Sequence, residues 1–443
     1  MNYLLCFTLI VLIFLTIIKN KGEVFSPSIM MLGGFLICNI VLIAEQSNWN
    51  YYISVKTYVL IISSCLMFII GDFVISKIKL FTSNKNIDSD IFFDNGRFLV
   101  DENKIFVIAL IFYSLIVLVL QVKYFLQISS LVGNTKGIFG AFSVGGNIRS
   151  YVTHESLERG FIETLIIKGG LPVSFIAFFL FCLNVSAELK VKHNKILLLP
   201  MLLFMLSELF TTNRIGIINC CIYMLVSWIC ILQIKKHWFY VNPNKKIIKI
   251  AILTCILLFV VFRLSGFATQ RGLSRSMFDQ ISDYTGASIV ALDIKVCNND
   301  FELGNAADLF SGFFRITNKL GLSEVSFSET NASFVYWQNG STNIYTAICA
   351  YISSIGYLGN YFTFLFMGVL YGCLYSRIKE SKSMFSVIVF SWLIFAPTLS
   401  CIADRFYTQI FIVNVLIQII EIYILIYFFV KPKLIYEVIL DCS

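Results

Sequence analysis

The chain has 443 residues, of which 58% are hydrophobic and 14% are charged, and its mean hydropathy is +0.82. A soluble domain is nearer half apolar and a quarter charged, so this composition excludes an ordinary water-soluble protein. The net charge of +8 would favour nucleic acid in a soluble protein, but here basic residues in short loops explain it. We therefore expect a single membrane domain, 1–443, and no nucleic-acid partner.

Apolar segments long enough to cross a bilayer recur along the whole chain. A spanning helix needs about 20 mostly apolar residues. The predicted fold class is therefore all-α, a polytopic integral membrane protein with about eleven transmembrane helices. The predicted spans are 3–18, 29–44, 57–76, 105–125, 161–187, 196–212, 215–234, 247–266, 345–376, 384–401 and 407–429. In the first span the basic residues follow the apolar stretch, the reverse of a signal peptide, so we expect a retained helix.

Two of these spans are less regular than the others. The segment 161–187 contains Lys168 and Pro172, and the segment 345–376 is long and contains Gly356. A proline or glycine inside an apolar run can mark a break in a helix. Either segment could therefore be a short interfacial piece followed by a true span.

Basic residues gather in alternate connections, which predicts the side of the membrane for each loop, because cytoplasmic loops carry an excess of Lys and Arg. The basic connections are those near 19–21, 77–104, 190–195, 235–249, 377–382 and 431–433. This pattern places the N-terminus outside and the C-terminus inside. The loops that then face outward are 45–56, 126–160, 213–214, 267–344 and 402–406.

The long polar loop 267–344 interrupts the apolar pattern. It carries clustered positive charge, from Arg271, Arg275, Lys295, Arg315 and Lys319. A membrane protein that keeps so long a polar segment on one face is expected to act there, and the sign of the charge predicts an anionic ligand. We expect this loop to form part of an active site.

Arginines near the predicted outer face indicate where such an anion binds. Arg214 lies in a tight link between two apolar helices, and Arg263 leads into Arg271 and Arg275. Arg149, in loop 126–160, contributes a second basic patch. Guanidinium groups form paired hydrogen bonds with phosphates. Two plainer explanations stay open: Arg214 only anchors a helix end, and the other arginines only attract anionic headgroups, although that attraction would favour the cytoplasmic face.

Motifs for a nucleotide or a metal are missing from the sequence. It has no P-loop, HExxH or GxSxG pattern, and its 13 cysteines lie mostly inside apolar segments, with no CxxC pair. The sequence Asp300-Phe301-Glu302 is the nearest approach to a metal-binding pattern and is very weak evidence. We therefore expect no cofactor and no metal.

The layout and three local patterns resemble the Wzy-type O-antigen polymerases. The first pattern, Thr212-Asn213-Arg214-Ile215-Gly216, is similar to an arginine motif at the start of a span that polymerases share with the O-antigen ligases. The second is an arginine followed eleven positions later by a glycine, met by Arg149 with Gly160 and by Arg275 with Gly286. The third is Asn343-Ile344-Tyr345-Thr346, followed by Gly356-Tyr357-Leu358-Gly359. The ligases keep a histidine in the long loop, and loop 267–344 has none, which favours a polymerase.

The resemblance implies a GT-C-like glycosyltransferase of the bacterial inner membrane, with its active site facing the periplasm. Its substrates would be oligosaccharide repeat units carried on undecaprenyl pyrophosphate, which it would join into a surface polysaccharide of the O-antigen or capsule type. The partners implied are membrane lipid and a protein that regulates chain length.

The resemblance also implies roles for individual residues. Catalytic roles fall to Arg214, Arg271 and Arg275, which would stabilise the departing pyrophosphate, and to a base, for which Asp283, Asp293 and His154 are candidates. Substrate-binding roles fall to Arg149, Arg263, Tyr284, Arg315, Asn343 and Tyr345.

The main alternative is a flippase or other transporter for the same lipid-linked oligosaccharide, and the next is an O-antigen ligase. Transporters often contain repeated halves and helices broken near the midplane, and the sequence shows neither clearly. A non-catalytic scaffold would have little use for arginines at helix ends.

Overall fold

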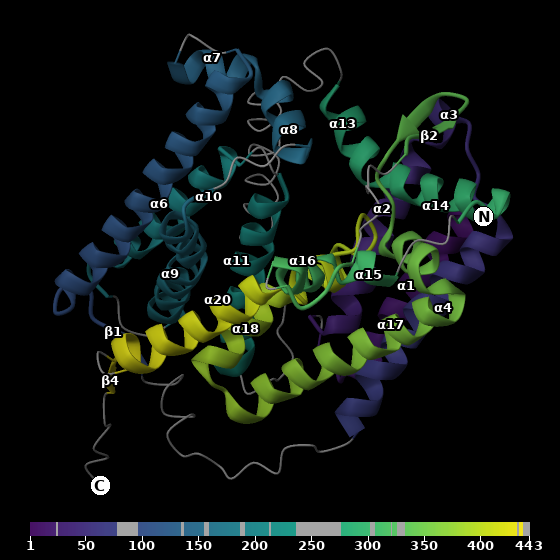
Figure 1. Cartoon of the computed structure of the whole chain (residues 1–443). Coiled ribbons are helices and arrows are strands. Elements are labelled where there is room, and N and C mark those ends of the chain that lie inside the picture. Colours follow the sequence, from purple (N-terminus) through teal and green to yellow (C-terminus); the bar gives the residue numbers. More distant parts are fainter. Residues whose placement is uncertain are drawn as a thin grey trace, which may run out of the picture. The chain divides into compact units, whose positions relative to one another are not determined.

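In the computed structural model, the described part of the chain is predominantly helical (Figure 1). The structure describes residues 1–23, 25–77, 96–133, 137–154, 159–186, 191–211, 214–235, 276–301, 306–319, 321–325, 333–431 and 434–436. Within these ranges, eight helices are long and apolar enough to cross a membrane. The coarse prediction of a helical, multi-pass membrane protein is therefore confirmed.

These eight helices coincide with eight of the predicted spans. They are α1 (Asn2–Lys19), α2 (Pro27–Ala44), α4 (Val55–Lys77), α6 (Lys104–Leu131), α9 (Phe161–Ser186), α11 (Arg214–Lys235), α17 (Ala347–Ser381) and α20 (Val413–Ile424) with its π-helical continuation η3 (Leu425–Val430).

The count of eleven spans stays a prediction. The segment 247–266 lies outside the described residues. The other two predicted spans contain shorter helices, which are the 3-10 helix η1 (Asn194–Leu198), α10 (Leu199–Leu209), α18 (Met384–Leu393) and α19 (Phe395–Thr398). At about 1.5 Å per residue, none of these is long enough alone to cross the hydrocarbon core.

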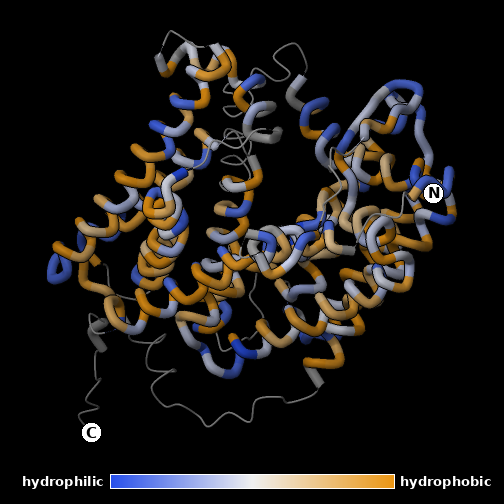
Figure 2. The backbone as a smooth tube through the Cα atoms, viewed as in Figure 1, coloured by the Kyte–Doolittle hydropathy of each residue, from blue (hydrophilic) through white to orange (hydrophobic). Residues whose placement is uncertain are grey.

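Large apolar side chains stay exposed on the long helices. Phe7 and Phe14 of α1 are 65% and 61% exposed, and Ile105 and Phe112 of α6 are 87% and 63% exposed. Figure 2 shows hydrophobic colour over most of the length of these helices. A helix that is apolar on all sides belongs in a core or in lipid, and these side chains are not covered by protein, so they fit a lipid surface.

The chain forms two compact units, each built from segments that are far apart in the sequence. Unit 1 comprises Met1–Thr82, Ser276–Glu380 and Leu393–Val415. Unit 2 comprises Ser83–Arg275, Ser381–Trp392 and Leu416–Ser443. A division of this kind leaves no local signal, such as a polar linker, in the sequence.

Short elements complete unit 1. They are α3 (Gln46–Trp49), α13 (Met277–Tyr284), α14 (Gly286–Asn298), α15 (Ala306–Leu309), α16 (Ser311–Lys319), β2 (Val335–Trp337), β3 (Gly340–Thr342) and the π-helix η2 (Phe406–Ile410). Strands β2 and β3 form an antiparallel hairpin in which Val335 is opposite Thr342. The predicted loop 267–344 is thus built, where described, of short helices and a hairpin, and its external location stays a prediction.

Helix α2 is the centre of unit 1, where it contacts α1, α4, α14 and α19. Its Leu32 and Phe35 side chains are fully buried. Gly34 lies so close to α19 that a Cβ atom would overlap the backbone oxygen of Thr398. In membranes such close approach of backbones replaces the hydrophobic effect as a source of helix association.

Helices α4 and α17 also pack through glycines. Gly71 of α4 lies against backbone atoms of α17, and Gly368 and Gly372 of α17 lie against backbone atoms of α4. A spacing of four puts two small residues on one face of a helix, which lets the partner backbone approach. Larger side chains at these positions would force the two helices apart.

Helix α17 is interrupted at Gly356, whose φ of 73° and ψ of 178° are not helical. Positive φ of this size is a conformation that glycine adopts readily and other residues rarely. The segment therefore consists of a short first piece and a long apolar helix that begins at Tyr357. This arrangement agrees with the alternative of a short piece followed by a true span.

Helix α14 is buried although it lies within the polar region 267–344. Ile289, Val290 and Leu292 are fully buried, and the helix contacts α2 and α4. The backbone of Gly286 lies beside that of Leu42 in α2. The spans predicted from the sequence omit α14, because its 13 residues are too few to cross a membrane.

In unit 2, helices α6, α9, α10 and α11 pack against one another (Figure 1). Phe175 of α9 stacks on Tyr223 of α11 with ring centroids 3.7 Å apart. Pro172 lies inside α9 and cannot donate to the carbonyl of Lys168. The side-chain amide of Gln418 in α20 donates to that carbonyl instead, at 3.0 Å.

The remaining elements of unit 2 are α7 (Gly137–Ser143), α8 (Gly145–His154), β1 (Gly96–Phe98) and β4 (Leu434–Tyr436). Strands β1 and β4 are antiparallel, and the side chain of Asn184 exchanges two hydrogen bonds, of 3.0 and 2.9 Å, with the backbone of Phe98. The all-α prediction did not include these two small sheets.

Replacement of Gly34 by alanine is expected to lower the melting temperature of the full-length protein in detergent by several degrees. The new methyl group would overlap the Thr398 carbonyl, and overpacking of this kind costs about 1–3 kcal/mol. The adjacent Gly33 provides a matched control, because a Cβ there meets nothing within 4 Å. Equal melting temperatures for Gly34→Ala and Gly33→Ala would contradict the packing described.

Candidate functional site

The six predicted arginines are only partly described. Those outside the described residues are Arg263, Arg271 and Arg275. Arg149 lies in α8, Arg214 is the first residue of α11 and Arg315 lies in α16, and for these three the backbone alone is described. Convergence of their guanidinium groups therefore stays a prediction, although the helices that carry Arg149 and Arg214 can be compared.

The helix of Arg149 meets the segment that precedes Arg214 at one end of unit 2. Ile148, beside Arg149, belongs to a buried cluster with Phe125 and other residues of α6 and α7. Phe210, four residues before Arg214, packs against the same cluster. Arg149 and Arg214 are 65 positions apart in the sequence. The segments next to them, at Ile148 and Phe210, pack in the same hydrophobic cluster.

A carboxylate that the sequence analysis did not single out lies against the first turn of α11. Glu208, near the end of α10, packs so closely on Gly216 that any Cβ there would overlap the carboxylate. Negative charge is favourable beside a helix N-terminus. Arg159 interacts electrostatically with Glu208, and its guanidinium carbon lies 3.6 Å from the ring centroid of Tyr124. An acidic residue inside the apolar segment 196–212 was the signal that could have identified this group.

Charges of both signs therefore gather at this end of unit 2. Besides the Glu208–Arg159 pair, the ammonium of Lys123 lies 2.7 Å from the carboxylate of Glu163. A region with guanidinium groups can hold a phosphate, and a carboxylate within it can accept a proton.

Four other predicted site residues come together in unit 1. Asp283 and Tyr284 end helix α13, and Asn343 and Tyr345 follow strand β3. The Thr342 hydroxyl of β3 donates to the backbone oxygen of Asp283 at 3.4 Å. The structure thus brings two pairs that are about sixty residues apart to one part of the surface of unit 1, as a shared binding role requires.

Tyr345 and the nearby Lys295 are already engaged by other groups. The Tyr345 hydroxyl donates to the backbone oxygen of Ser333 at 2.6 Å. The Lys295 ammonium lies 2.8 Å from the carboxylate of Asp300. Partial burial alone would lower the pKa of Lys295, but the hydrogen bond and charge of Asp300 outweigh it and raise the pKa. Lys295 is therefore a cation that is largely neutralised by its neighbour.

Asp293, one of the candidate bases, acts as a structural anchor. It is 3% exposed, and its carboxylate accepts hydrogen bonds from the Tyr51 hydroxyl at 2.8 Å, the Ser54 backbone N–H at 2.9 Å and the Ser54 hydroxyl at 2.7 Å. Burial, and then the charge of Asp293, raise the pKa of Tyr51, so that this hydroxyl remains a donor. Asp293 therefore ties α14 to the chain that enters α4.

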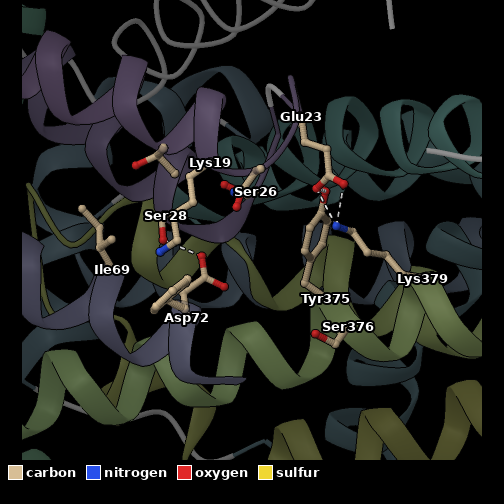
Figure 3. Close-up of a pocket in the computed structure, with 12 residues that line it drawn as sticks. Lys19, Glu23, Ser26, Ser28, Ile69, Asp72, Tyr375, Ser376 and Lys379 are labelled. Carbon is tan, nitrogen blue, oxygen red and sulfur yellow. Dashed lines mark hydrogen bonds and ion pairs between the residues drawn. The ribbon is translucent and has the colours of Figure 1, made fainter. Parts of the chain in front are cut away.

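A small polar cavity of about 40 Å³ lies at the other end of unit 1, where α1, α2, α4 and α17 meet (Figure 3). The Lys379 ammonium contacts both carboxylate oxygens of Glu23 at 2.6 Å, and the Tyr375 hydroxyl donates to Glu23 at 3.1 Å. The Ser28 hydroxyl donates to Asp72 at 2.5 Å. Both carboxylates of this cavity are thus stabilised by donors from neighbouring helices.

The volume of this cavity limits what it can hold. The Ser26 hydroxyl lines it, is 1% exposed and has no hydrogen-bond partner among the described residues. A space of this size has room for a few water molecules but not for a lipid-linked sugar. We interpret the cavity as a polar region in which the Lys379–Glu23 ion pair and the Ser28–Asp72 hydrogen bond hold the helix ends together.

Comparison of the chain with protein-family models, with curated proteins and with solved structures finds no match. The case for a function therefore depends on the chemistry of the residues described above, in unit 1 and in unit 2 separately.

Replacement of Asp293 by alanine is expected to destabilise the full-length protein by about 1–3 kcal/mol, because the partly buried donors of Tyr51 and Ser54 would lose their acceptor. Thermal unfolding in detergent would measure the change. Asp300→Ala is the matched control, because the side chain of Asp300 is 56% exposed and its ion pair contributes little. If the control lost as much stability as Asp293→Ala, the anchoring role of Asp293 would be wrong.

Proposed function

We propose that the chain is a polysaccharide polymerase of the bacterial inner membrane. It would join oligosaccharide repeat units carried on undecaprenyl pyrophosphate into an O-antigen or capsule type of polymer, on the periplasmic face. The observation that carries the proposal is the shared hydrophobic cluster that holds the Arg149 helix beside the segment leading to Arg214. We propose that two predicted external loops supply the guanidinium groups of Arg149 and Arg214 to this end of unit 2.

The membrane helices support the same proposal. Eight apolar helices suit an enzyme whose substrates are dissolved in lipid through a polyprenyl chain. A protein that regulates chain length is the partner that we propose for control of polymer size.

The proposed reaction forms one bond and breaks another. A hydroxyl of the acceptor sugar attacks the anomeric carbon of the donor sugar, and its proton passes to a base. The bond between that carbon and the pyrophosphate oxygen breaks, and undecaprenyl pyrophosphate leaves with the electron pair. Negative charge therefore grows on phosphate oxygens, and cations that are already in position there stabilise the transition state. Arginine suits this role because it is always charged and presents a planar fork of donors.

Two carboxylates are candidates for the base. Glu208 shares unit 2 with Arg149 and Arg214 and lies against the first turn of α11. Asp283 lies in unit 1, next to Tyr284 and near Asn343. A base within hydrogen-bond reach of the attacking hydroxyl typically contributes about 100- to 10,000-fold in rate. Glu208 is a group that we add to the candidates named from the sequence.

One observation favours the alternative of a transporter for lipid-linked oligosaccharides. Discontinuous membrane helices are common at transporter binding sites, and α17 is interrupted at Gly356. A transporter would move the lipid-linked unit across the bilayer without forming a glycosidic bond. A ligase would form the bond but would need a different lipid as the acceptor. Reconstitution with lipid-linked repeat units as the only substrate therefore separates the three functions.

Replacement of Arg214 or Arg149 by alanine is expected to reduce polymerisation about 100- to 1,000-fold, the usual cost of removing one donor to transition-state charge. Arg214→Lys should have an intermediate effect, because it keeps the charge and loses the fork. The assay uses purified full-length protein in liposomes with a defined undecaprenyl-pyrophosphate-linked repeat unit, and the polymer is resolved on gels. Arg377→Ala, at an exposed position near the end of α17, is the control and should retain activity.

Wild-type rates of polymer formation by both alanine variants would show that these arginines are not part of the site. Movement of the lipid-linked unit across the bilayer by the wild-type protein, with no polymer formed, would identify a transporter and reject the proposed function.

A further inference from the structure

A groove of about 460 Å³ lies in unit 1 beside the break in α17. Three helices form its walls: the beginning of α4, the end of α14 and the part of α17 that follows Gly356. The residues that line it are Val55, Lys56, Val59, Leu60, Val296, Asn299, Tyr357 and Tyr361. This volume falls in the range of about 300–1,000 Å³ that is usual for small-molecule sites.

Lys56 is the cation among the described residues that line the groove. Lys56, the second residue of α4, is exposed and forms no hydrogen bond or ion pair with the residues that the structure describes. The amide of Asn299 and the rings of Tyr357 and Tyr361 line the same groove. An ammonium group attracts phosphate, an amide can bond to a hydroxyl, and aromatic faces offer apolar platforms for a sugar ring.

Along α4 the groove changes from polar to apolar. Val59 and Leu60 follow Lys56 by about one helical turn, toward the middle of a membrane-spanning helix. Val59 is 53% exposed, so its side chain is available for an apolar contact. A ligand that fits this gradient has an anionic head at the end of the helix and a hydrocarbon chain directed along it.

Bonds between the walls hold the groove in shape. Asp293 of α14 accepts both hydrogen bonds from Ser54, two residues before Lys56, and so fixes the start of α4. The Ser63 hydroxyl of α4 donates to the Tyr361 hydroxyl of α17 at 3.1 Å. A site whose walls are fixed before binding loses less conformational entropy when the ligand arrives.

We infer that this groove binds the phosphate head and the first sugar of a polyprenyl-linked glycan. Lys56 contacts the phosphate, and Tyr357 and Tyr361 contact the sugar. The inference rests on the proposed function, because joining two lipid-linked molecules requires two places for their phosphates. The groove, which lies wholly within unit 1, is one of these places.

The test is site-resolved photolabelling of the full-length protein in nanodiscs of neutral lipid. The probe is undecaprenyl pyrophosphate that carries one monosaccharide with a photoreactive group on the sugar. The measured quantity is the probe concentration that gives half-maximal labelling of the peptide containing Tyr357 and Tyr361. We expect Lys56→Gln to raise this concentration at least tenfold, Lys56→Arg and Tyr357→Phe to change it little, and Tyr357→Leu to raise it.

Lys104→Gln is the matched control, because Lys104 is an exposed lysine at the start of a membrane helix in unit 2. Its labelling should equal that of the wild type, and thermal unfolding should show that every variant is folded. Labelling of the groove peptide that is unchanged in Lys56→Gln, or that is absent in the wild type, would overturn the inference. Equal displacement of the probe by phosphatidylglycerol would also overturn it, because the groove would then be a general headgroup site.

The labelling needs no polymerisation, so the two proposals can fail separately. If labelling depends on Lys56 but the protein forms no polymer, the proposed binding site in the groove is supported and the proposed polymerase activity is rejected. If the protein forms polymer but the peptide containing Tyr357 and Tyr361 is not labelled, the polymerase activity is supported and the binding site in the groove is rejected.

Discussion

In a bilayer, a backbone N–H or C=O without a partner costs several kcal/mol, because no water is present to replace the lost hydrogen bond. The long helices satisfy these groups within themselves. Pro172 in α9 lacks an N–H group and cannot make the helical hydrogen bond to the carbonyl of Lys168. The side-chain amide of Gln418 donates to that carbonyl instead. Helix α17 is broken at Gly356, and Tyr357, the residue that follows, lines a groove.

The same constraint determines how the helices associate. Lipid tails are as apolar as leucine, so burial of apolar surface does not by itself bring two membrane helices together, and close packing must do so. In unit 1 the close packing comes from glycines, with Gly34 against α19 and Gly368 against α4. In unit 2 it comes from aromatic pairs such as Phe175 with Tyr223 and from Gly170 of α9, which lies against Val117 of α6. Bulky substitutions at the glycines would therefore disturb unit 1 more than a loss of apolar area would.

Polar chemistry in this protein lies near the ends of its helices. In unit 2, Glu208 lies against Gly216 in the first turn of α11, the helix that begins at Arg214, and in unit 1, Lys56 lies at the start of α4. In unit 1 the exposed lysine lies beside a shaped groove, which a simple anchor to lipid headgroups would not need. The carboxylate of Asp293 accepts two hydrogen bonds from Ser54 and so fixes the backbone that precedes Lys56.

The sequence by itself determined eight of the spans, because apolar length is a local property and each spanning helix satisfies its own backbone. It also directed attention to Arg214, since a charge in a short link between apolar helices is visible without a structure. The tertiary structure alone decided that α14 is buried, that Glu208 lies on Gly216, and that Asp293 is an anchor and not a free base. These outcomes depend on contacts between distant segments, such as that of Ser54 with Asp293, which are 239 residues apart. No local pattern of residues contains the information for such a contact, because it is created only when the helices pack.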